Sequence, residues 1–312
     1  MFHILSAEQI DHNEFGQLFE TAAEFEKTDK RIDSRKEVMQ RRFGRIMLSM
    51  YYEPSTRTRF SFEIAAKKLG IEVIGTENAA KFSSAAKGET IEDTIRVLNH
   101  YGVDAISLRT KEDGQAVRAA SVSRVPIING GDGKGEHPSQ AILDLYTIEK
   151  EIGRLNNLNI VIGGDLANGR TARSLAQLVS KYPKNHINFV STPELQIGQD
   201  IKAKLVQDGT SFSETSEMYD ALRNADVVYW TRLQLERMSE DEKLSIGQEN
   251  FVLDATALEV LPREAIILHP LPRQAEIPVS TDSDPRAKYF SQAGNGLYIR
   301  MAILDTIMSQ LS

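Results

Sequence analysis

Short apolar segments alternate with amphipathic segments along most of this 312-residue sequence, and this alternation is the feature that most restricts the fold. The apolar runs have the length of strands and are bounded by turn residues, whereas the segments between them carry apolar residues at helical spacing. A buried strand followed by a helix, repeated along a chain, is typical of a parallel sheet covered by helices. The sequence therefore predicts an α/β fold.

The alternation divides into two halves. In the first half we expect strands at 45–52, 71–76 and 103–110, with helices at 60–70 and 90–101. In the second half we expect strands at 158–165, 187–192, 226–232 and 265–273, helices after Arg170 and at 193–207, and a closing helix at 295–311. Gly70 suits the end of a helix, and Thr90 with Asp93 resembles a capping box at the start of one.

The glycine-rich stretch at 128–140 interrupts this alternation, and a long amphipathic segment at 139–152 follows it. We predict two doubly wound parallel-sheet domains, joined by this junction helix and by the closing helix. The predicted domain boundaries are 1–138 together with 294–312 for the first domain, and 139–293 for the second.

Composition excludes several classes of protein. The formal net charge of −7 and the lack of a long basic run argue against broad binding to nucleic acids or anionic membranes. The chain has no cysteine, and its six histidines are scattered without metal-ligand spacing, so we expect no disulfide, no metal and no cofactor. No stretch approaches the roughly 18 apolar residues of a membrane span, and the N-terminus lacks a signal-peptide pattern. We expect a cytoplasmic protein.

The segment "EPSTRTR" at 53–59 places arginines where a strand passes into a helix. A helix N-terminus carries partial positive charge and unpaired N–H groups, so a cation is unfavourable there unless an anion binds. Ser55 suits the N-cap, and the hydroxyl groups of Thr56 and Thr58 together with the guanidinium of Arg57 suit a tetrahedral phosphate.

The alternative for this segment is a solvated helix start. For Arg59 we favour that alternative, because Glu63 lies four residues further along the same helix and can form an ion pair. For Arg57 we favour phosphate binding.

Four other residues are candidates whose signals are weak when each is taken alone. Lys87 lies in a loop of small residues, where a solvated surface lysine is the default interpretation. Arg109 ends a predicted strand, at the edge where open α/β sheets bind ligands. His137 and Gln140 begin the junction helix, where a structural histidine is equally compatible with the sequence.

Four short motifs, taken in their order along the chain, resemble those of a known family. "STRTR", "SSAAKGE", "HPSQ" and "HPLPR" occur at spacings that strongly resemble the aspartate/ornithine carbamoyltransferase family, and the resemblance extends from near the N-terminus to "GNGLYIR" at 294–300. It implies that the phosphate of carbamoyl phosphate is held by the "STRTR" loop, and that backbone carbonyls hold its amide. The residues implied in binding carbamoyl phosphate are Ser55, Thr56, Arg57, Thr58, Ser83, Lys87, Arg109, His137, Gln140, Pro270 and Leu271.

The second half supplies candidates for the other substrate. Arg170, Arg232 and Gln234 provide two guanidinium groups and one amide, which suit a dicarboxylate. The resemblance implies that these residues, with Thr171 and Lys87, bind aspartate, whereas the ornithine-specific patterns "HPCQ", "SMG" and "HCLP" do not occur. For Arg170 alone, an ion pair with Asp165 is an alternative. The glycines of "GGDLANG" do not match the dinucleotide-binding spacing.

The resemblance implies transfer of the carbamoyl group of carbamoyl phosphate to the α-amine of aspartate, a step of pyrimidine biosynthesis. The implied catalytic residues are Thr58, Lys87, Arg109 and His137. It also implies a homotrimer whose sites are shared between subunits through the loop that carries Ser83 and Lys87, and it leaves open whether regulatory chains bind. The alternatives are another amino-acid acceptor such as ornithine, a non-catalytic subunit of the same family, and a nucleotide-dependent oxidoreductase, against which the missing glycine pattern argues.

Overall fold

The computed structural model describes residues 2–133, 135–233 and 251–311, and its contacts divide the chain into two compact units. Unit 1 comprises residues 1–142 and 294–312, and unit 2 comprises residues 143–293. Both units are built on a parallel sheet, which confirms the predicted fold class. The boundary at 142/143 lies within helix α7 (Pro138–Ile152), and helix α13 (Tyr289–Ser309) also has residues in both units. The functional division at 138/139 stays a prediction.

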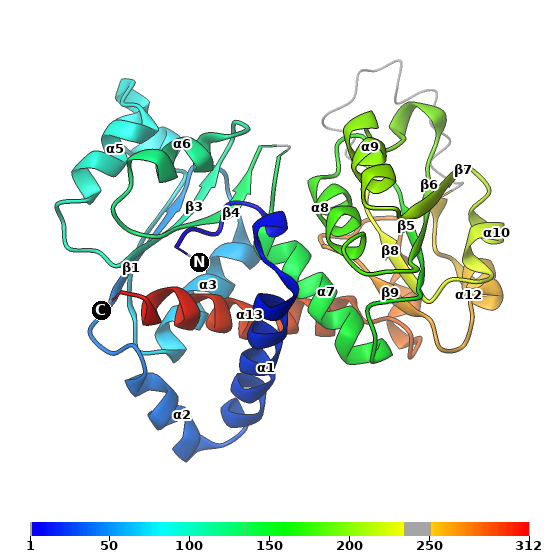
Figure 1. Cartoon of the computed structure of the whole chain (residues 1–312), viewed down its shortest axis with the longest axis horizontal. Helices are drawn as coiled ribbons and strands as arrows, with labels where there is room; N and C mark the ends of the chain where they lie inside the picture. The colour runs from blue at the N-terminus through cyan, green and yellow to red at the C-terminus, as the bar shows by residue number, and fades with distance from the viewer. Residues whose placement is uncertain (1, 134, 234–250, 312) are drawn as a thin grey trace. The chain divides into compact units, whose positions relative to one another are not determined.

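Unit 1 contains a four-stranded parallel sheet in the order β2-β1-β3-β4 (Figure 1). The strands are β1 (Ile46–Tyr51), β2 (Glu72–Glu77), β3 (Ala105–Thr110) and β4 (Ile127–Asp132). Before and between them lie η1 (Ala7–Gln9), α1 (His12–Asp29), α2 (Ile32–Gln40), α3 (Thr56–Lys68), α4 (Ala79–Phe82), η2 (Ser84–Lys87), α5 (Ile91–Leu98) and α6 (Gln115–Val122).

Helices cover both faces of this sheet. In Figure 1, α5 and α6 lie on one face, and α1, α3 and the end of α13 lie on the other. The α5/α6 face has a continuous apolar core that includes Leu48, Ile95, Ile106, Leu108 and Ile127. This layering places the carboxyl ends of all four parallel strands along one edge of the sheet, where α/β proteins bind ligands.

Unit 2 contains a five-stranded parallel sheet in the order β7-β6-β5-β8-β9. The strands are β5 (Asn159–Gly163), β6 (His186–Val190), β7 (Ser211–Thr215), β8 (Val227–Trp230) and β9 (Ile266–Leu268). The other elements are α8 (Arg170–Val179), η3 (Pro193–Leu195), α9 (Gln199–Gln207), α10 (Met218–Leu222), α12 (Ala255–Val260) and η6 (Val279–Ser283). In Figure 1, α8 and α9 cover one face of the sheet and α10 and α12 the other, over a core centred on Trp230.

Two sequence predictions were wrong in detail. The predicted helix at 193–207 is a short turn, η3, followed by α9, because the carbonyl of Leu195 accepts from the N–H groups of Leu166 and Ala167, each at 3.1 Å, and not from the next helical turn. The glycine-rich stretch does not interrupt the alternation at residue 128, because β4 continues to Asp132. Gly130 fits there because a Cβ atom at that position would lie 3.1 Å from the hydroxyl of Tyr51.

Candidate functional site

The loop between β1 and α3 delivers the predicted phosphate-binding residues to the carboxyl edge of the sheet in unit 1. Ser55 is the N-cap of α3, as predicted, but its side chain makes no capping hydrogen bond. Its N–H group donates to Oε1 of Glu77 at 3.4 Å, which ties the loop to the end of β2. The first turn of α3 contains Thr56, Arg57 and Thr58 and no acidic residue. No carboxylate within the first turn of α3 therefore offsets the positive partial charge of this helix N-terminus.

Arg57 and Arg109 lie close enough to influence each other. Partial desolvation of a side chain that stays largely exposed, first, and the positive charge of Arg109, second, lower the pKa of Arg57. Arg57 has an exposed side chain and forms no ion pair with any residue that the structure describes. Two positive groups that repel each other, one of them in the first turn of a helix, favour the binding of an anion, because an anion relieves the repulsion.

Arg109 itself is held by a residue that we did not predict. Its Nε and Nη2 atoms lie 2.9 Å and 2.8 Å from Oε2 of Glu53, and its Nη1 atom donates to the carbonyl of Gly130 at 3.2 Å. Glu53 directly precedes the "PSTRTR" loop, so the sequence alone shows that this carboxylate is adjacent to the predicted phosphate-binding residues. Its partner could not be deduced from the sequence, because Arg109 lies 56 residues away.

Arg59 has the structural role that we favoured. Its Nε atom lies 2.8 Å from Oε1 of Glu63, one helical turn on, and its Nη1 atom lies 2.9 Å from Oε2 of Glu77. The hydrogen bond to Glu63 is the main reason that the pKa of Arg59 is raised. The two arginines of "TRTR" therefore differ: Arg59 is neutralised within the fold, and Arg57 is not.

His137 is brought to the same edge of the sheet by the loop that follows β4. Its Nε2 atom lies 3.2 Å from Oγ1 of Thr58, and both side chains are buried. The buried carboxylate of Asp132 orders this loop by accepting from the N–H groups of Glu136, at 2.8 Å, and Gly114, at 3.0 Å. The structure thus brings together Thr58 and His137, which are 79 residues apart. Gln140 lies in the first turn of α7, just beyond His137.

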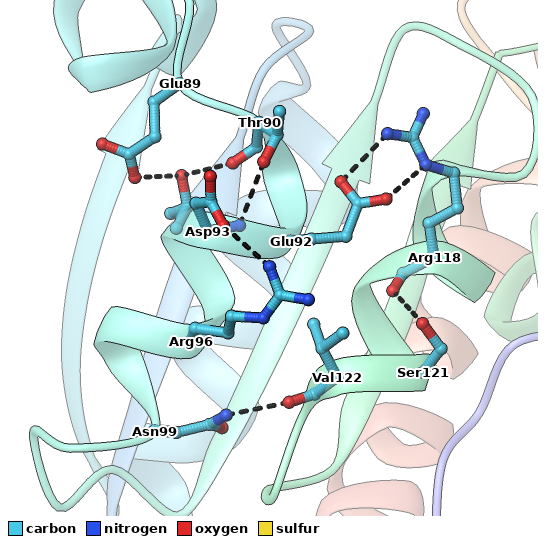
Figure 2. Close-up of polar contacts among 10 residues, drawn as sticks. Glu89, Thr90, Glu92, Asp93, Arg96, Asn99, Arg118, Ser121 and Val122 are labelled. Carbon is cyan, nitrogen blue, oxygen red and sulfur yellow. Dashed lines mark hydrogen bonds and ion pairs between the residues drawn. The ribbon is translucent and has the colours of Figure 1, made fainter.

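Ser83 and Lys87 lie in the segment between β2 and α5. Lys87 is exposed at the end of η2, and no hydrogen bond or ion pair in the described part of unit 1 joins either residue to Arg57, Arg109 or His137. The segment that follows is firmly attached: Thr90 caps α5 by accepting from the N–H group of Asp93, and the carboxylate of Glu89 accepts from the hydroxyl of Thr94 at 2.7 Å (Figure 2).

Helix α5 is in turn fixed to α6. Two nitrogen atoms of Arg118 donate to the two carboxylate oxygens of Glu92, at 2.6 Å and 2.9 Å (Figure 2). The amide of Asn99 donates to the carbonyl of Val122 at 2.8 Å. These contacts hold α5, the helix that follows the loop of Lys87, against α6.

In unit 2, the predicted residues follow three adjacent strands. Arg170 and Thr171 form the first turn of α8, after β5, and Arg232 lies two residues beyond the end of β8. Pro270 and Leu271 lie just beyond β9. Since β5, β8 and β9 are neighbours in the sheet, these residues share its carboxyl edge. Gln234, the remaining predicted residue, lies outside the described residues.

The glycines that follow β5 have a packing role. A Cβ atom at Gly163 would lie 2.1 Å from the indole ring of Trp230, and one at Gly164 would lie 2.0 Å from the carbonyl of Thr231. Gly164 also has a φ of +103°. Both the N–H group and the hydroxyl of Thr231 donate to the carbonyl of Gly163, at 2.8 Å and 3.0 Å. These contacts fix the residue directly before Arg232.

Within 2–133, 135–233 and 251–311, no cluster of three or more histidine or acidic side chains could hold a metal ion. None of the helices in these ranges is both long and apolar enough to cross a membrane.

The fold and the residues at its strand ends define a two-unit, parallel-sheet α/β protein with a cationic loop suited to phosphate in unit 1. Comparison with known proteins identifies the family within this class of α/β proteins. Residues 3–150 match the family model "Aspartate/ornithine carbamoyltransferase, carbamoyl-P binding domain", and residues 156–307 match "Aspartate/ornithine carbamoyltransferase, Asp/Orn binding domain". The chain belongs to the aspartate/ornithine carbamoyltransferase family.

Individual relatives agree with this assignment. A protein of Oryza sativa subsp. japonica named "Aspartate carbamoyltransferase, chloroplastic" is 48% identical over 307 residues, which are 98% of this chain and 84% of the relative. The catalytic subunit of aspartate transcarbamoylase from M. jannaschii superposes with a TM-score of 0.89 at 40% identity, covering 99% of this chain and 98% of the other. The aspartate transcarbamoylase of Trypanosoma cruzi, solved in complex with carbamoyl phosphate, has a TM-score of 0.89 at 35% identity, covering 98% and 95%. The same Trypanosoma enzyme has also been solved in complex with carbamoyl aspartate and phosphate, with a TM-score of 0.87 at 34% identity.

Proposed function

We propose that this protein transfers the carbamoyl group of carbamoyl phosphate to the α-amine of L-aspartate, giving N-carbamoyl-L-aspartate and phosphate in pyrimidine biosynthesis. The observation that carries the proposal is the arrangement of Arg57, Arg109 and the Thr58–His137 pair at the N-terminus of α3. This arrangement suits a phosphate linked to a carbonyl group, because it combines positive charge with hydrogen-bond donors for an oxyanion. The aspartate transcarbamoylases among the relatives support the choice of acceptor.

In unit 1, the hydroxyls of Ser55, Thr56 and Thr58 and the guanidinium of Arg57 hold the phosphate in this proposal. Arg109 contacts both the phosphate and the carbonyl oxygen. To reach them it exchanges part of its pairing with Glu53, whose carboxylate lies 2.8 Å from Nη2 of Arg109. His137 donates to the same carbonyl oxygen, and the side chain of Gln140 binds the carbamoyl amide.

In unit 2, we propose that the guanidinium groups of Arg170 and Arg232, with Thr171 and Gln234, bind the two carboxylates of aspartate. The backbone carbonyls of Pro270 and Leu271 accept from the carbamoyl NH₂ group. None of the hydrogen bonds among the described residues uses either carbonyl, so both can accept from a ligand. We further propose that the aspartate-binding function belongs to residues 139–293, and the carbamoyl phosphate-binding function to 1–138 with 294–312.

The chemistry follows from these roles. The neutral α-amine of aspartate attacks the carbonyl carbon, a tetrahedral oxyanion forms, and the C–O bond to phosphate breaks. Thr58, Arg109 and His137 stabilise the oxyanion, and the leaving phosphate accepts the proton of the amine. Binding the two substrates in fixed orientation and stabilising the oxyanion supply the rate enhancement, and no covalent enzyme intermediate is needed.

We also propose that the protein is a cytoplasmic homotrimer. Ser83 and Lys87 then complete the site of a neighbouring subunit, with Ser83 on the phosphate and Lys87 on both substrates. The assignment is supported by the contacts within one chain, since no hydrogen bond or ion pair in the described part of unit 1 joins either residue to Arg57 or Arg109. Sedimentation with and without UMP or CTP tests both the trimer and the binding of regulatory nucleotides, and cell fractionation tests the location.

The activity is tested by incubating the protein with carbamoyl phosphate and either aspartate or ornithine. We expect ureido product from aspartate and at least about 100-fold less from ornithine, because ornithine cannot place a second carboxylate on the arginines. Replacement of Arg232 by alanine should raise the KM for aspartate and leave the KM for carbamoyl phosphate nearly unchanged. Equal rates with both acceptors would refute the proposed specificity.

A further inference from the structure

A buried histidine–glutamate pair spans the loop that follows β9. His269 and Glu276 are only 2% and 8% exposed, and Nε2 of the histidine lies 2.9 Å from Oε1 of the glutamate. Neither residue was among the predicted site residues. Both lie in unit 2, at the two ends of the loop that contains Pro270 and Leu271.

Each member of the pair holds one backbone N–H group of this loop. Leu271 N–H donates to Nδ1 of His269 at 2.8 Å, and Gln274 N–H donates to Oε1 of Glu276 at 2.9 Å. Because Nδ1 accepts, the proton of the neutral imidazole is on Nε2, where it is donated to Glu276. One uninterrupted series of hydrogen bonds therefore runs from Leu271 through both side chains to Gln274.

The loop needs such support, because Leu271 has a φ of +52°. A residue with a bulky side chain rarely takes this left-handed conformation, and the surrounding structure has to hold it there. Two further bonds hold the ends of the loop. His269 N–H donates to Oε1 of Gln292 at 2.9 Å, and Leu253 N–H donates to the carbonyl of Glu276 at 2.9 Å.

We propose that His269 and Glu276 are positioning residues that aim the carbonyls of Pro270 and Leu271 at the carbamoyl NH₂ group. This proposal rests on the proposed function, which assigns those carbonyls to that group. Correct placement of these carbonyls should make the site specific for carbamoyl phosphate. The phosphate is bound elsewhere, so the carbonyls distinguish carbamoyl phosphate from acetyl phosphate, which carries a methyl group in place of the NH₂ group. A site built to accept hydrogen bonds rejects an analogue that lacks the donors.

The test compares the dissociation constants of carbamoyl phosphate and acetyl phosphate, measured by calorimetry on the full-length protein. In Glu276→Ala the series of hydrogen bonds is broken, and we expect the preference for carbamoyl phosphate to fall at least about tenfold. The affinity for inorganic phosphate should change less than about twofold, since the pair holds the loop of Pro270 and Leu271 and the phosphate is assigned to residues of unit 1.

Two control variants separate positioning from general stability. Glu276→Gln keeps an acceptor oxygen for both Gln274 N–H and His269 Nε2–H, so it should retain the preference. Asn185→Ala removes another buried side chain of unit 2, one that bonds to the backbone of Leu155, Leu158 and Val179. It should lower the melting temperature without changing the preference. If Glu276→Ala does not fold, Glu276→Asp replaces it in the test. Its side chain is one methylene shorter, and its preference for carbamoyl phosphate over acetyl phosphate should also fall at least about tenfold.

The outcomes distinguish the two proposals. A wild-type protein that binds carbamoyl phosphate and acetyl phosphate equally would refute the proposed role of the two carbonyls. A wild-type protein that discriminates, together with a Glu276→Ala variant that discriminates equally well, would refute only the positioning role. Hydrogen exchange of the Leu271 and Gln274 amides, which needs no ligand, should accelerate in Glu276→Ala; unchanged exchange would also overturn the positioning role.

Discussion

The two arginines of "TRTR" should respond to substitution in opposite ways, although they are only two residues apart. Arg59 is 20% exposed and pairs with Glu63 and Glu77, which are 18% and 37% exposed. The pair with Glu63, at i, i+4, contributes about 0.3–0.5 kcal/mol, and the pair with Glu77 contributes at most about 1 kcal/mol because its carboxylate is partly solvated. Replacement of Arg59 by alanine should therefore cost up to about 1.5 kcal/mol of unfolding free energy, or up to about 2 °C in Tm for a chain of 312 residues.

Replacement of Arg57 by alanine should leave the stability without ligand unchanged or raise it slightly. It removes a positive charge from a helix N-terminus, where cations are unfavourable by about 0.3–1 kcal/mol, and relieves the repulsion from Arg109. The substitution should instead lower the affinity for carbamoyl phosphate. Losing two charge-assisted hydrogen bonds of about 1.5–3 kcal/mol each should weaken carbamoyl phosphate binding by about 10²- to 10⁴-fold.

The assay is a pair of measurements on each variant, the Tm without anion and the dissociation constant of carbamoyl phosphate by calorimetry. The Arg59 variant should show the lower Tm with nearly normal binding, and the Arg57 variant the reverse. If the Arg59 variant loses as much affinity as the Arg57 variant, or if the Arg57 variant is clearly destabilised without anion, then the division of roles between these arginines is wrong.

Three further predictions concern other parts of the structure. Gly164→Ala should lower the unfolding free energy in urea by about 3 kcal/mol, because its Cβ atom would meet the carbonyl of Thr231; a loss below about 1 kcal/mol would contradict the observed close approach. Burial acts to raise the pKa of Glu276, but the hydrogen bond from the buried histidine and the backbone N–H bonds outweigh it, and the pKa is lowered from 4.5. The ionised Glu276 carboxylate therefore stabilises the fold above pH 4.5, and this stabilisation is lost as the pH falls. The Tm difference between wild type and Glu276→Gln should be constant near neutral pH and shrink below pH 4.5; a difference that does not depend on pH would refute the stabilising role of the ionised carboxylate. If the protein is the homotrimer that we propose, Lys87→Ala and His137→Ala variants, each reduced in activity about 10²- to 10³-fold or more, should regain activity after subunit exchange; no recovery after proven exchange would exclude shared sites.

Features that depend on neighbouring residues were predictable from the sequence. Ser55 as the N-cap of α3 and the Arg59–Glu63 pair both follow from helical spacing, and the structure confirms both. The strand predicted at 45–52 and the helix predicted at 60–70 lie within four residues of the observed bounds of β1 and α3. We did not predict α1, although Asp11 and Glu14 form a capping box ahead of apolar residues at helical spacing, which is a readable signal.

Features that depend on distant residues were not predictable. Glu53 has an obvious place in the sequence, but nothing local shows that it holds Arg109. The break between η3 and α9 arises because Leu195 bonds to residues of another loop, a tertiary contact that overrides local helical preference. The roles of His269 and Glu276 likewise depend on folding that buries both side chains together.

The most direct test of the proposed reaction is to mix the wild-type protein with ¹³C-labelled carbamoyl phosphate and aspartate and to follow ¹³C and ³¹P signals by NMR. The account predicts that the ureido carbon of N-carbamoyl-L-aspartate and free phosphate appear in equal amounts, at a rate that falls at least about 10²-fold in the His137→Ala variant. Release of phosphate without ureido product, or no turnover at all, would contradict it.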